Sequence, residues 1–72
     1  MDNTITQERS ELIKEWCREK VFFNNLPQTD VHLVLNMRDL GKGFYYTNTQ
    51  AVQLNRIRQE WIDWRNCVVS NS

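Results

Sequence analysis

The sequence predicts a mainly α, small helical domain, in which long N- and C-terminal helices flank a middle segment made of a helix and an extended connector. Two observations carry this prediction: apolar side chains recur at helical spacing near both ends, and proline and glycine residues separate the periodic segments. The chain has 72 residues, of which 40% are hydrophobic and 25% charged, as in globular proteins. We therefore expect one domain, residues 1–72, with a net stability of only about 3–5 kcal/mol.

The first helix is predicted to begin at Thr4 or Thr6, because Thr4 followed by Gln7 fits a capping box. It is expected to end before the proline of the Asn-Asn-Leu-Pro run at 24–27. Its apolar face contains Ile5, Leu12, Ile13, Trp16, Cys17, Val21 and Phe23. This face is wider than one neighbouring helix needs, and Phe22 adds a ring outside it. The excess apolar surface predicts a homodimer or stability that depends on a partner.

The middle segment fits two structures. A helix over 29–40 would place Leu33, Val34, Met37 and Leu40 on one side, with Thr29 or Asp30 as its cap. Gly41 would end it. Alternating side chains over 31–37 also fit a strand, and the aromatic run at 43–47 could pair with it. We favour the helix with 43–47 as an extended connector; the alternative is an α-β-β-α fold with a hairpin at about 31–47.

The last helix has the clearest pattern. Thr47 and Gln50 form a second candidate capping box at its start. Its apolar side chains recur at intervals of three and four residues: Leu54, Ile57, Trp61, Trp64 and Val68. Two tryptophans in one apolar stripe indicate that something large covers it, so core packing is the main interpretation for both.

The charge and cysteine content restrict the class of partner and the compartment. The chain has nine Lys+Arg and nine Asp+Glu, so it lacks the basic excess of a protein bound to nucleic acid mainly by charge. It has only two cysteines, whereas a secreted scaffold of this size is usually rich in disulfides. No signal-peptide pattern and no long apolar run occurs. We therefore expect a cytoplasmic protein that does not bind a membrane.

The residues that carry catalysis or bind metals do not form a recognisable motif. His32 is the only histidine, and neither Cys17 nor Cys67 lies near it in sequence. The Gly-Lys-Gly turn at 41–43 is too short for a phosphate-binding loop. Glu60 and Asp63 share one exposed helix face, which is a common surface arrangement, and nothing marks them as catalytic. We expect no catalytic residue, no metal site and no cofactor, and hence a protein that is not an enzyme.

Tyr45, Tyr46, Arg58, Ile62 and Arg65 are the candidate partner-binding residues. Adjacent tyrosines in an extended segment point to opposite sides, so at most one can be buried. Arg58 and Arg65 are seven residues apart and stack along one edge of the last helix. The alternative is that both guanidinium groups pair with acids of the first helix or lie over a tryptophan of the stripe.

We therefore expect a small non-enzymatic accessory protein that binds another protein, as an adaptor or inhibitor. Tyr and Arg are enriched at such interfaces. In its charge balance, its tryptophan content and its lack of a catalytic motif, the chain resembles small accessory proteins of phages and mobile elements. The alternative is a small DNA-binding regulator of transcription or recombination. In that case Lys42, Arg56, Arg58 and Arg65 would contact phosphates.

Overall fold

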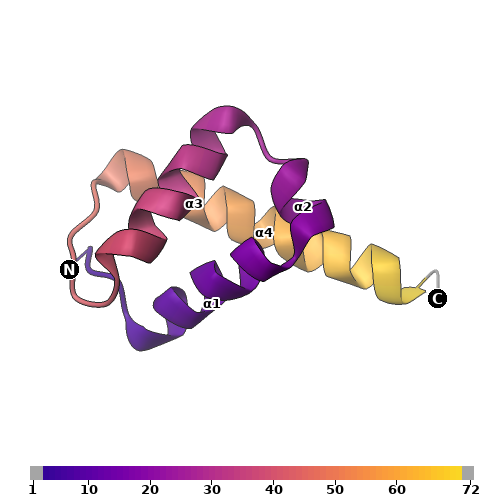
Figure 1. Ribbon diagram of the computed structural model, residues 1–72, viewed down its shortest axis with the longest axis horizontal. Helices are drawn as coiled ribbons and strands as arrows, with labels where there is room; N and C mark the ends of the chain where they lie inside the picture. The colour runs from indigo at the N-terminus through magenta and orange to yellow at the C-terminus, as the bar shows by residue number, and fades with distance from the viewer. Residues whose placement is uncertain (1–2, 71–72) are drawn as a thin grey trace.

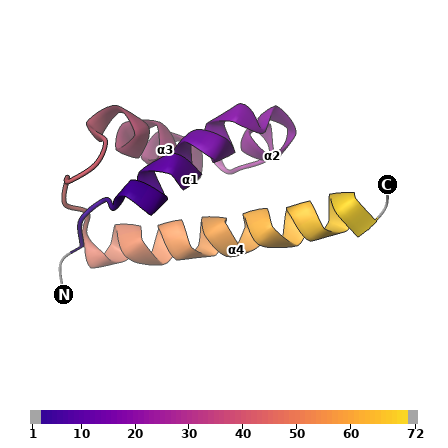
Figure 2. The same ribbon diagram turned by 90° about the horizontal axis from the view of Figure 1, so that it is seen from below.

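Four helices and no strand make up the part of the chain that the computed structural model describes, residues 3–70, with side chains through residue 68. In chain order they are α1 (Gln7–Arg18), α2 (Lys20–Asn24), α3 (Gln28–Leu40) and α4 (Asn48–Ser70). Figure 2 shows two layers, with α4 beneath a layer formed by α1, α2 and α3. The mainly α fold is thus confirmed. The hairpin alternative at 31–47 is wrong, because 31–37 lies inside α3.

The core lies between the two layers. α1 packs against α2 and α3, and α3 packs against α4. Its buried hydrophobic side chains are Ile5, Ile13, Trp16, Phe22, Leu26, Leu33, Val34, Met37, Leu54 and Ile57. The C-terminal turns of α4 extend past α2, as Figures 1 and 2 both show, and Val68 there is 48% exposed. The apolar stripe of α4 is therefore covered at Leu54 and Ile57 but only partly covered towards its end.

Helix α1 begins at the later of the two predicted positions. The Thr6 hydroxyl accepts a hydrogen bond from the backbone N–H of Arg9, so Thr6 is the N-cap. The capping box of Thr4 and Gln7 does not form, because Thr4 lies in an extended segment and the Gln7 side chain donates to Glu11 instead. Ile5 is buried, but it lies in this extended segment before α1, whereas the sequence placed it on the apolar face of the helix.

The first helix is also interrupted, which the periodicity did not indicate. Glu19 has a ψ of 82°, outside the helical region, and the chain restarts as α2 in a new orientation. This rotation buries Phe22, whose ring lies 5.7 Å from that of Trp64 in α4. Val21 is 64% exposed. The placement of Phe22 outside the core was therefore wrong, and Val21 supplies the exposed apolar surface instead.

Helix α3 matches the favoured interpretation except at its first turn. It begins at Gln28, Pro27 precedes it, and no side chain caps it by a hydrogen bond. Thr29 or Asp30 was predicted as the cap, but both lie inside the first turn, where Asp30 is fully buried. At the other end Gly41 has a φ of 76°, so the chain leaves the helix in a conformation that other residues adopt at a cost.

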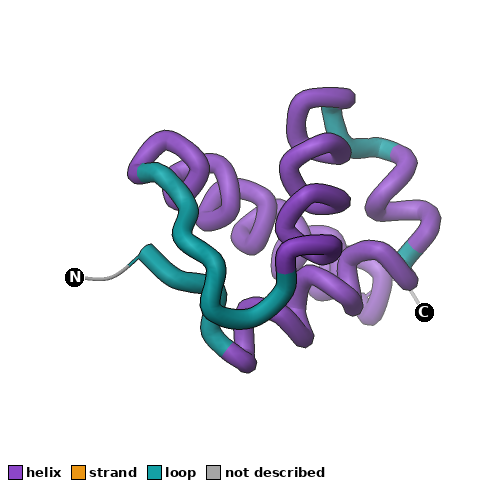
Figure 3. Tube along the Cα trace, turned by 60° about the vertical axis from the view of Figure 1, so that its left-hand side comes forward, coloured by secondary structure: helices purple, strands orange, loops and turns teal. Residues whose placement is uncertain are grey.

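The connector after α3 is extended, as predicted, and its partner is the N-terminal segment. Thr4 and Tyr45 form an isolated antiparallel bridge. The N–H of Ile5 donates to the carbonyl of Phe44 at 2.9 Å, and the N–H of Tyr46 donates to the carbonyl of Asn3 at 2.7 Å. Figure 3 shows these two loops side by side. The pairing satisfies backbone groups of both segments and ties the segment before α1 to the connector before α4.

Helix α4 has the capping box that its sequence predicts. The N–H of Gln50 donates to the Thr47 hydroxyl at 3.1 Å, and the N–H of Thr47 donates to the Gln50 side-chain oxygen at 2.8 Å. Both exchanged bonds satisfy N–H groups that a helix start leaves without partners. α1 and α4 then run in the same general direction along the molecule (Figure 2).

Candidate functional site

The candidate site lies where a side chain of α1 reaches α4. Arg9 of α1 reaches across to α4, where its Nη2 donates to the Asn55 side-chain oxygen at 3.4 Å. Asn55, Arg58 and Ile62 follow one another at helical spacing, so they share the edge of α4 that faces α1. Arg65 continues this edge one turn further. We call the residues Arg9, Leu12, Arg58, Ile62 and Arg65 together the α1–α4 edge.

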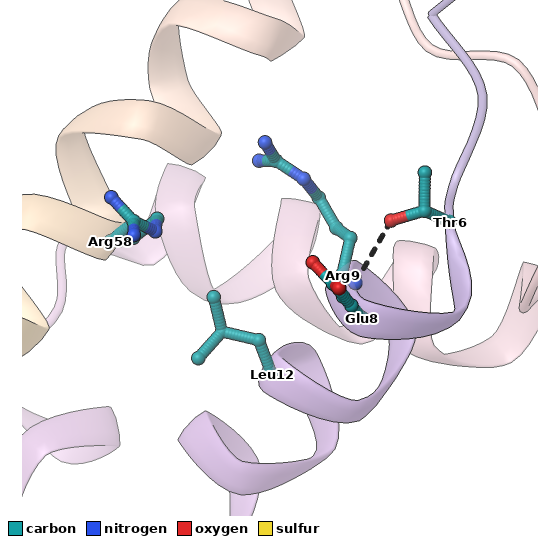
Figure 4. Close-up of a pocket in the computed structure, with 5 residues that line it drawn as sticks. All are labelled: Thr6, Glu8, Arg9, Leu12 and Arg58. Carbon is teal, nitrogen blue, oxygen red and sulfur yellow. Dashed lines mark hydrogen bonds between the residues drawn. The ribbon is translucent and has the colours of Figure 1, made fainter.

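A pocket opens within this edge. It has a volume of about 130 Å³ and is lined by Thr6, Glu8, Arg9, Leu12 and Arg58. Figure 4 shows Arg9 coming from α1 and Arg58 from α4, with Leu12 between them. The pocket therefore combines two guanidinium groups, one carboxylate, one hydroxyl and one apolar side chain.

Arg9 is held in place by its neighbours. Its guanidinium carbon lies 5.8 Å from the centre of the Tyr46 ring, within the range of a cation–π contact. Its Nη1 is buried and finds no hydrogen-bond acceptor among the described residues. Sequence reasoning missed Arg9, although its position three residues before Leu12 places it beside the apolar face of α1.

The arginines of the edge are not neutralised within the part of the chain from residue 3 to residue 70. The ion pairs there join Arg18 with Glu15, Arg38 with Asp39 and Arg56 with Asp30. None of them includes Arg9, Arg58 or Arg65. The Arg65 guanidinium carbon lies over the ring of Trp61, 4.7 Å from its centre. The sequence allowed this contact with a tryptophan of the stripe as the alternative to partner binding. Arg58 makes no such ring contact among the described residues and is exposed.

The two tyrosines lie on opposite sides of the connector, as expected. Tyr45 is 73% exposed, whereas Tyr46 is partly buried against the core and contacts Arg9. Arg9 therefore contacts Tyr46 and lines the same pocket as Arg58, whereas Tyr45 faces solvent.

The basic residues proposed for the DNA alternative do not share one face. Arg56 donates from Nη2 to both carboxylate oxygens of the buried Asp30, at 2.7 and 2.9 Å. This bond directs Arg56 towards α3, whereas Arg58 lines the pocket beside α1. Lys42 lies in the turn before α4, and Arg65 lies near the far end of that helix.

The other candidate residues are dispersed. His32 lies exposed on α3, Cys17 is half-buried in α1, and Cys67 is exposed on α4. Among residues 3–70, no three His, Cys, Asp or Glu side chains are grouped so that they could hold a metal ion. Glu60 and Asp63 are both exposed on α4.

Cys17 has a perturbed thiol. Burial raises its pKa, the charge and hydrogen bond of Arg38 lower it, and Asp39 raises it again, so that the pKa lies above its usual value. Because the thiolate is the nucleophile, we expect the native thiol to react with iodoacetamide more slowly at pH 8 than the same thiol in urea. The pH at which its rate is half-maximal should also be higher in the native protein.

The measurement uses the Cys67→Ser variant, so that Cys17 is the only thiol. Arg38→Gln removes the contact that lowers the pKa, so this variant should shift the pH–rate profile further upward. Equal rates in native and denatured protein would contradict the effect of burial. Because the pKa of Cys17 is higher in the folded protein than in the unfolded one, its contribution to the free energy of unfolding is fully present below the pKa of the unfolded thiol. This contribution is lost as pH rises through the pKa of the folded protein.

No helix in the described part of the chain is long and apolar enough to span a membrane. Comparison of the chain with protein-family models, with curated proteins and with solved structures found no match.

Proposed function

We propose that this protein is a small protein-binding module, an adaptor or an inhibitor, which contacts its partner through the α1–α4 edge. One observation carries the proposal. Arg9 and Arg58, from two different helices, line one open pocket, and neither forms an ion pair with a described residue. Guanidinium groups beside apolar side chains are typical of residues that dominate binding energy at protein interfaces.

Two further features support a protein partner. Ile62 is only half-buried beside the arginines, and the Trp61 ring, partly exposed, carries Arg65 on its face. Aromatic and arginine side chains are enriched at protein interfaces, whereas lysine and acidic residues are depleted at their centres. The net charge of zero also suits a partner recognised by local complementarity.

The test is affinity capture from a lysate of the source cells, with the tagged protein and with its Arg9→Ala/Arg58→Ala variant. We expect the wild type to retain one protein in a stoichiometric amount. The double variant should lose it, because each arginine at the centre of an interface contributes about 2 kcal/mol, or roughly 30-fold in affinity.

The matched control is Lys14→Ala/Lys20→Ala, which removes two exposed positive charges from α1 and α2 outside the pocket. It should retain the same protein. Equal capture by both variants would show that the α1–α4 edge is not the contact surface. Circular dichroism of each variant checks that the helices remain intact.

Titration with duplex DNA at two salt concentrations tests the alternative function. If the arginines contacted phosphates, log affinity would fall with log salt at a slope of roughly −0.9 per contact. We expect no such binding. Micromolar binding with this slope, abolished by Arg58→Ala/Arg65→Ala without loss of helicity, would replace the protein-binding proposal by a DNA-binding one.

A further inference from the structure

We propose that the pocket between α1 and α4 is a receptor for one carboxylate group, carried by an acidic side chain of the protein partner. This inference rests on the proposed function and names the chemistry that the site recognises. It uses Arg9 and Arg58 as the groups that bind the carboxylate.

The charge of the pocket fits a monoanion. Its lining contains the two positive charges of Arg9 and Arg58 and the one negative charge of Glu8, whereas Thr6 and Leu12 are neutral. The lining therefore has a net charge of one positive unit. A carboxylate neutralises this charge, whereas a dianionic phosphate would leave an excess negative charge next to Glu8.

Arg9 is prepared for an anion before one arrives. Its contacts with Tyr46 and Asn55 restrict the side chain, so little conformational entropy is lost on binding. Its Nη1 is shielded from water without an acceptor in the described part of the chain, so this one nitrogen has lost hydration that no hydrogen bond there replaces. A carboxylate beside the guanidinium would compensate this loss through its charge.

The remaining lining suits an acidic side chain. Guanidinium groups match the planar fork of a carboxylate, and two of them can share its two oxygens. The Thr6 hydroxyl accepts from the backbone N–H of Arg9 and can still donate its own hydrogen to an oxygen of the ligand. Leu12 offers an apolar contact for side-chain methylenes. The volume of about 130 Å³ is well above what a single water molecule needs.

The test is an NMR titration of the full-length protein with three probes. The first is N-acetylglutamic acid α-amide, which has one carboxylate; the second is N-acetylglutamine α-amide, its neutral isostere; the third is inorganic phosphate. We expect saturable shifts of the Arg9 and Arg58 side-chain signals with the first probe, with a dissociation constant on the order of 1–10 mM. The neutral isostere should bind at least tenfold more weakly, and phosphate should bind more weakly than the carboxylate.

Four variants sharpen the test. Arg58→Gln should weaken carboxylate binding at least tenfold, and Arg58→Lys should fall between this variant and the wild type, because it keeps the charge but loses the fork. Glu8→Gln raises the net charge of the lining, so it should strengthen the binding of phosphate more than that of the carboxylate. Lys14→Gln lies outside the pocket and outside the α1–α4 edge, and it should leave all three affinities unchanged.

Equal affinity for the carboxylate probe and its neutral isostere would overturn the inference, and so would tighter binding of phosphate or shifts confined to other surfaces. These outcomes are separable from failure of the proposed function. Loss of partner capture in the Arg9→Ala/Arg58→Ala variant, together with no carboxylate selectivity, would reject only the ligand chemistry. Carboxylate selectivity without a captured partner would reject only the proposed function.

Discussion

Replacing Trp16 by alanine is expected to leave about half of the protein or more unfolded at 25 °C. Trp16 lies in α1 between the two layers and is fully buried, and it is among the largest side chains of the core. Truncation of a buried tryptophan costs about 3–5 kcal/mol, through lost burial and the cavity that remains. A chain of this size has a net stability of about the same amount. Urea titration followed by far-UV circular dichroism measures the loss.

Trp16→Phe gives the informative comparison. The indole Nε1 of Trp16 is buried and has no acceptor among the described residues, so the wild-type protein carries the cost of an unsatisfied donor. Phenylalanine removes this donor and keeps most of the apolar volume. The variant should therefore stay folded, with a stability much closer to wild type than that of the alanine variant.

The matched control is Val52→Ala, since Val52 is 68% exposed on the outer face of α4. A change at an exposed position is expected to alter stability by no more than about 0.5 kcal/mol. If the Trp16→Ala and Val52→Ala variants unfolded at the same urea concentration, the core assignment of Trp16 would be untenable.

Local sequence signals predicted the elements that local interactions determine. The capping box of Thr47 and Gln50 needs only residues three apart, and both of its bonds form. Gly41 ends α3 because its positive φ is a property of that one position. The helical stripe of α4 is long enough for its period to be unambiguous, and its first members, Leu54 and Ile57, are fully buried.

Signals that depend on distant contacts were misread. Thr4 and Ile5 have a helical pattern with the residues that follow, but they pair with the connector before α4. The interruption at Glu19 allows Phe22 to reach Trp64, and no periodicity within 4–23 encodes that ring contact. Tertiary packing selects these conformations over the local preference.

The candidate site was predicted on the last helix and on the tyrosines of the connector, with no residue of the first helix. Arg58 was identified from its place beside the stripe of α4, and in the structure it lines the pocket. Arg9 could not be identified in the same way, because its importance depends on where α1 lies relative to α4. The binding role of both residues stays a prediction. Arg56 was grouped with Arg58 on charge alone, although its partner Asp30 is 26 residues away in sequence.

Replacing Arg56 by alanine is expected to destabilise the protein by about 2–3 kcal/mol. The carboxylate of Asp30 is fully buried, and its two hydrogen bonds in the described structure both come from Arg56. Removal of one partner of such a pair leaves a buried charge without compensation, which costs about 3–5 kcal/mol in a fully buried pair. Arg56 itself is half-exposed, so water can replace part of the contact. We therefore expect a smaller loss of stability than for a pair in which both partners are buried.

The measurement is a double-mutant cycle by urea unfolding of Arg56→Ala, Asp30→Ala and the double variant. The double variant should lose less stability than the sum of the single variants, because removing both partners leaves no buried charge. Arg58→Ala, two residues along the same helix, is the matched control and should change stability by at most about 0.5 kcal/mol. If Arg56→Ala were as mild as Arg58→Ala, Asp30 would not depend on Arg56, and Arg56 would again be available to a partner. A large loss confined to Arg56→Ala would instead assign these neighbouring arginines separate roles, one stabilising the contact between α3 and α4 and the other remaining free to bind.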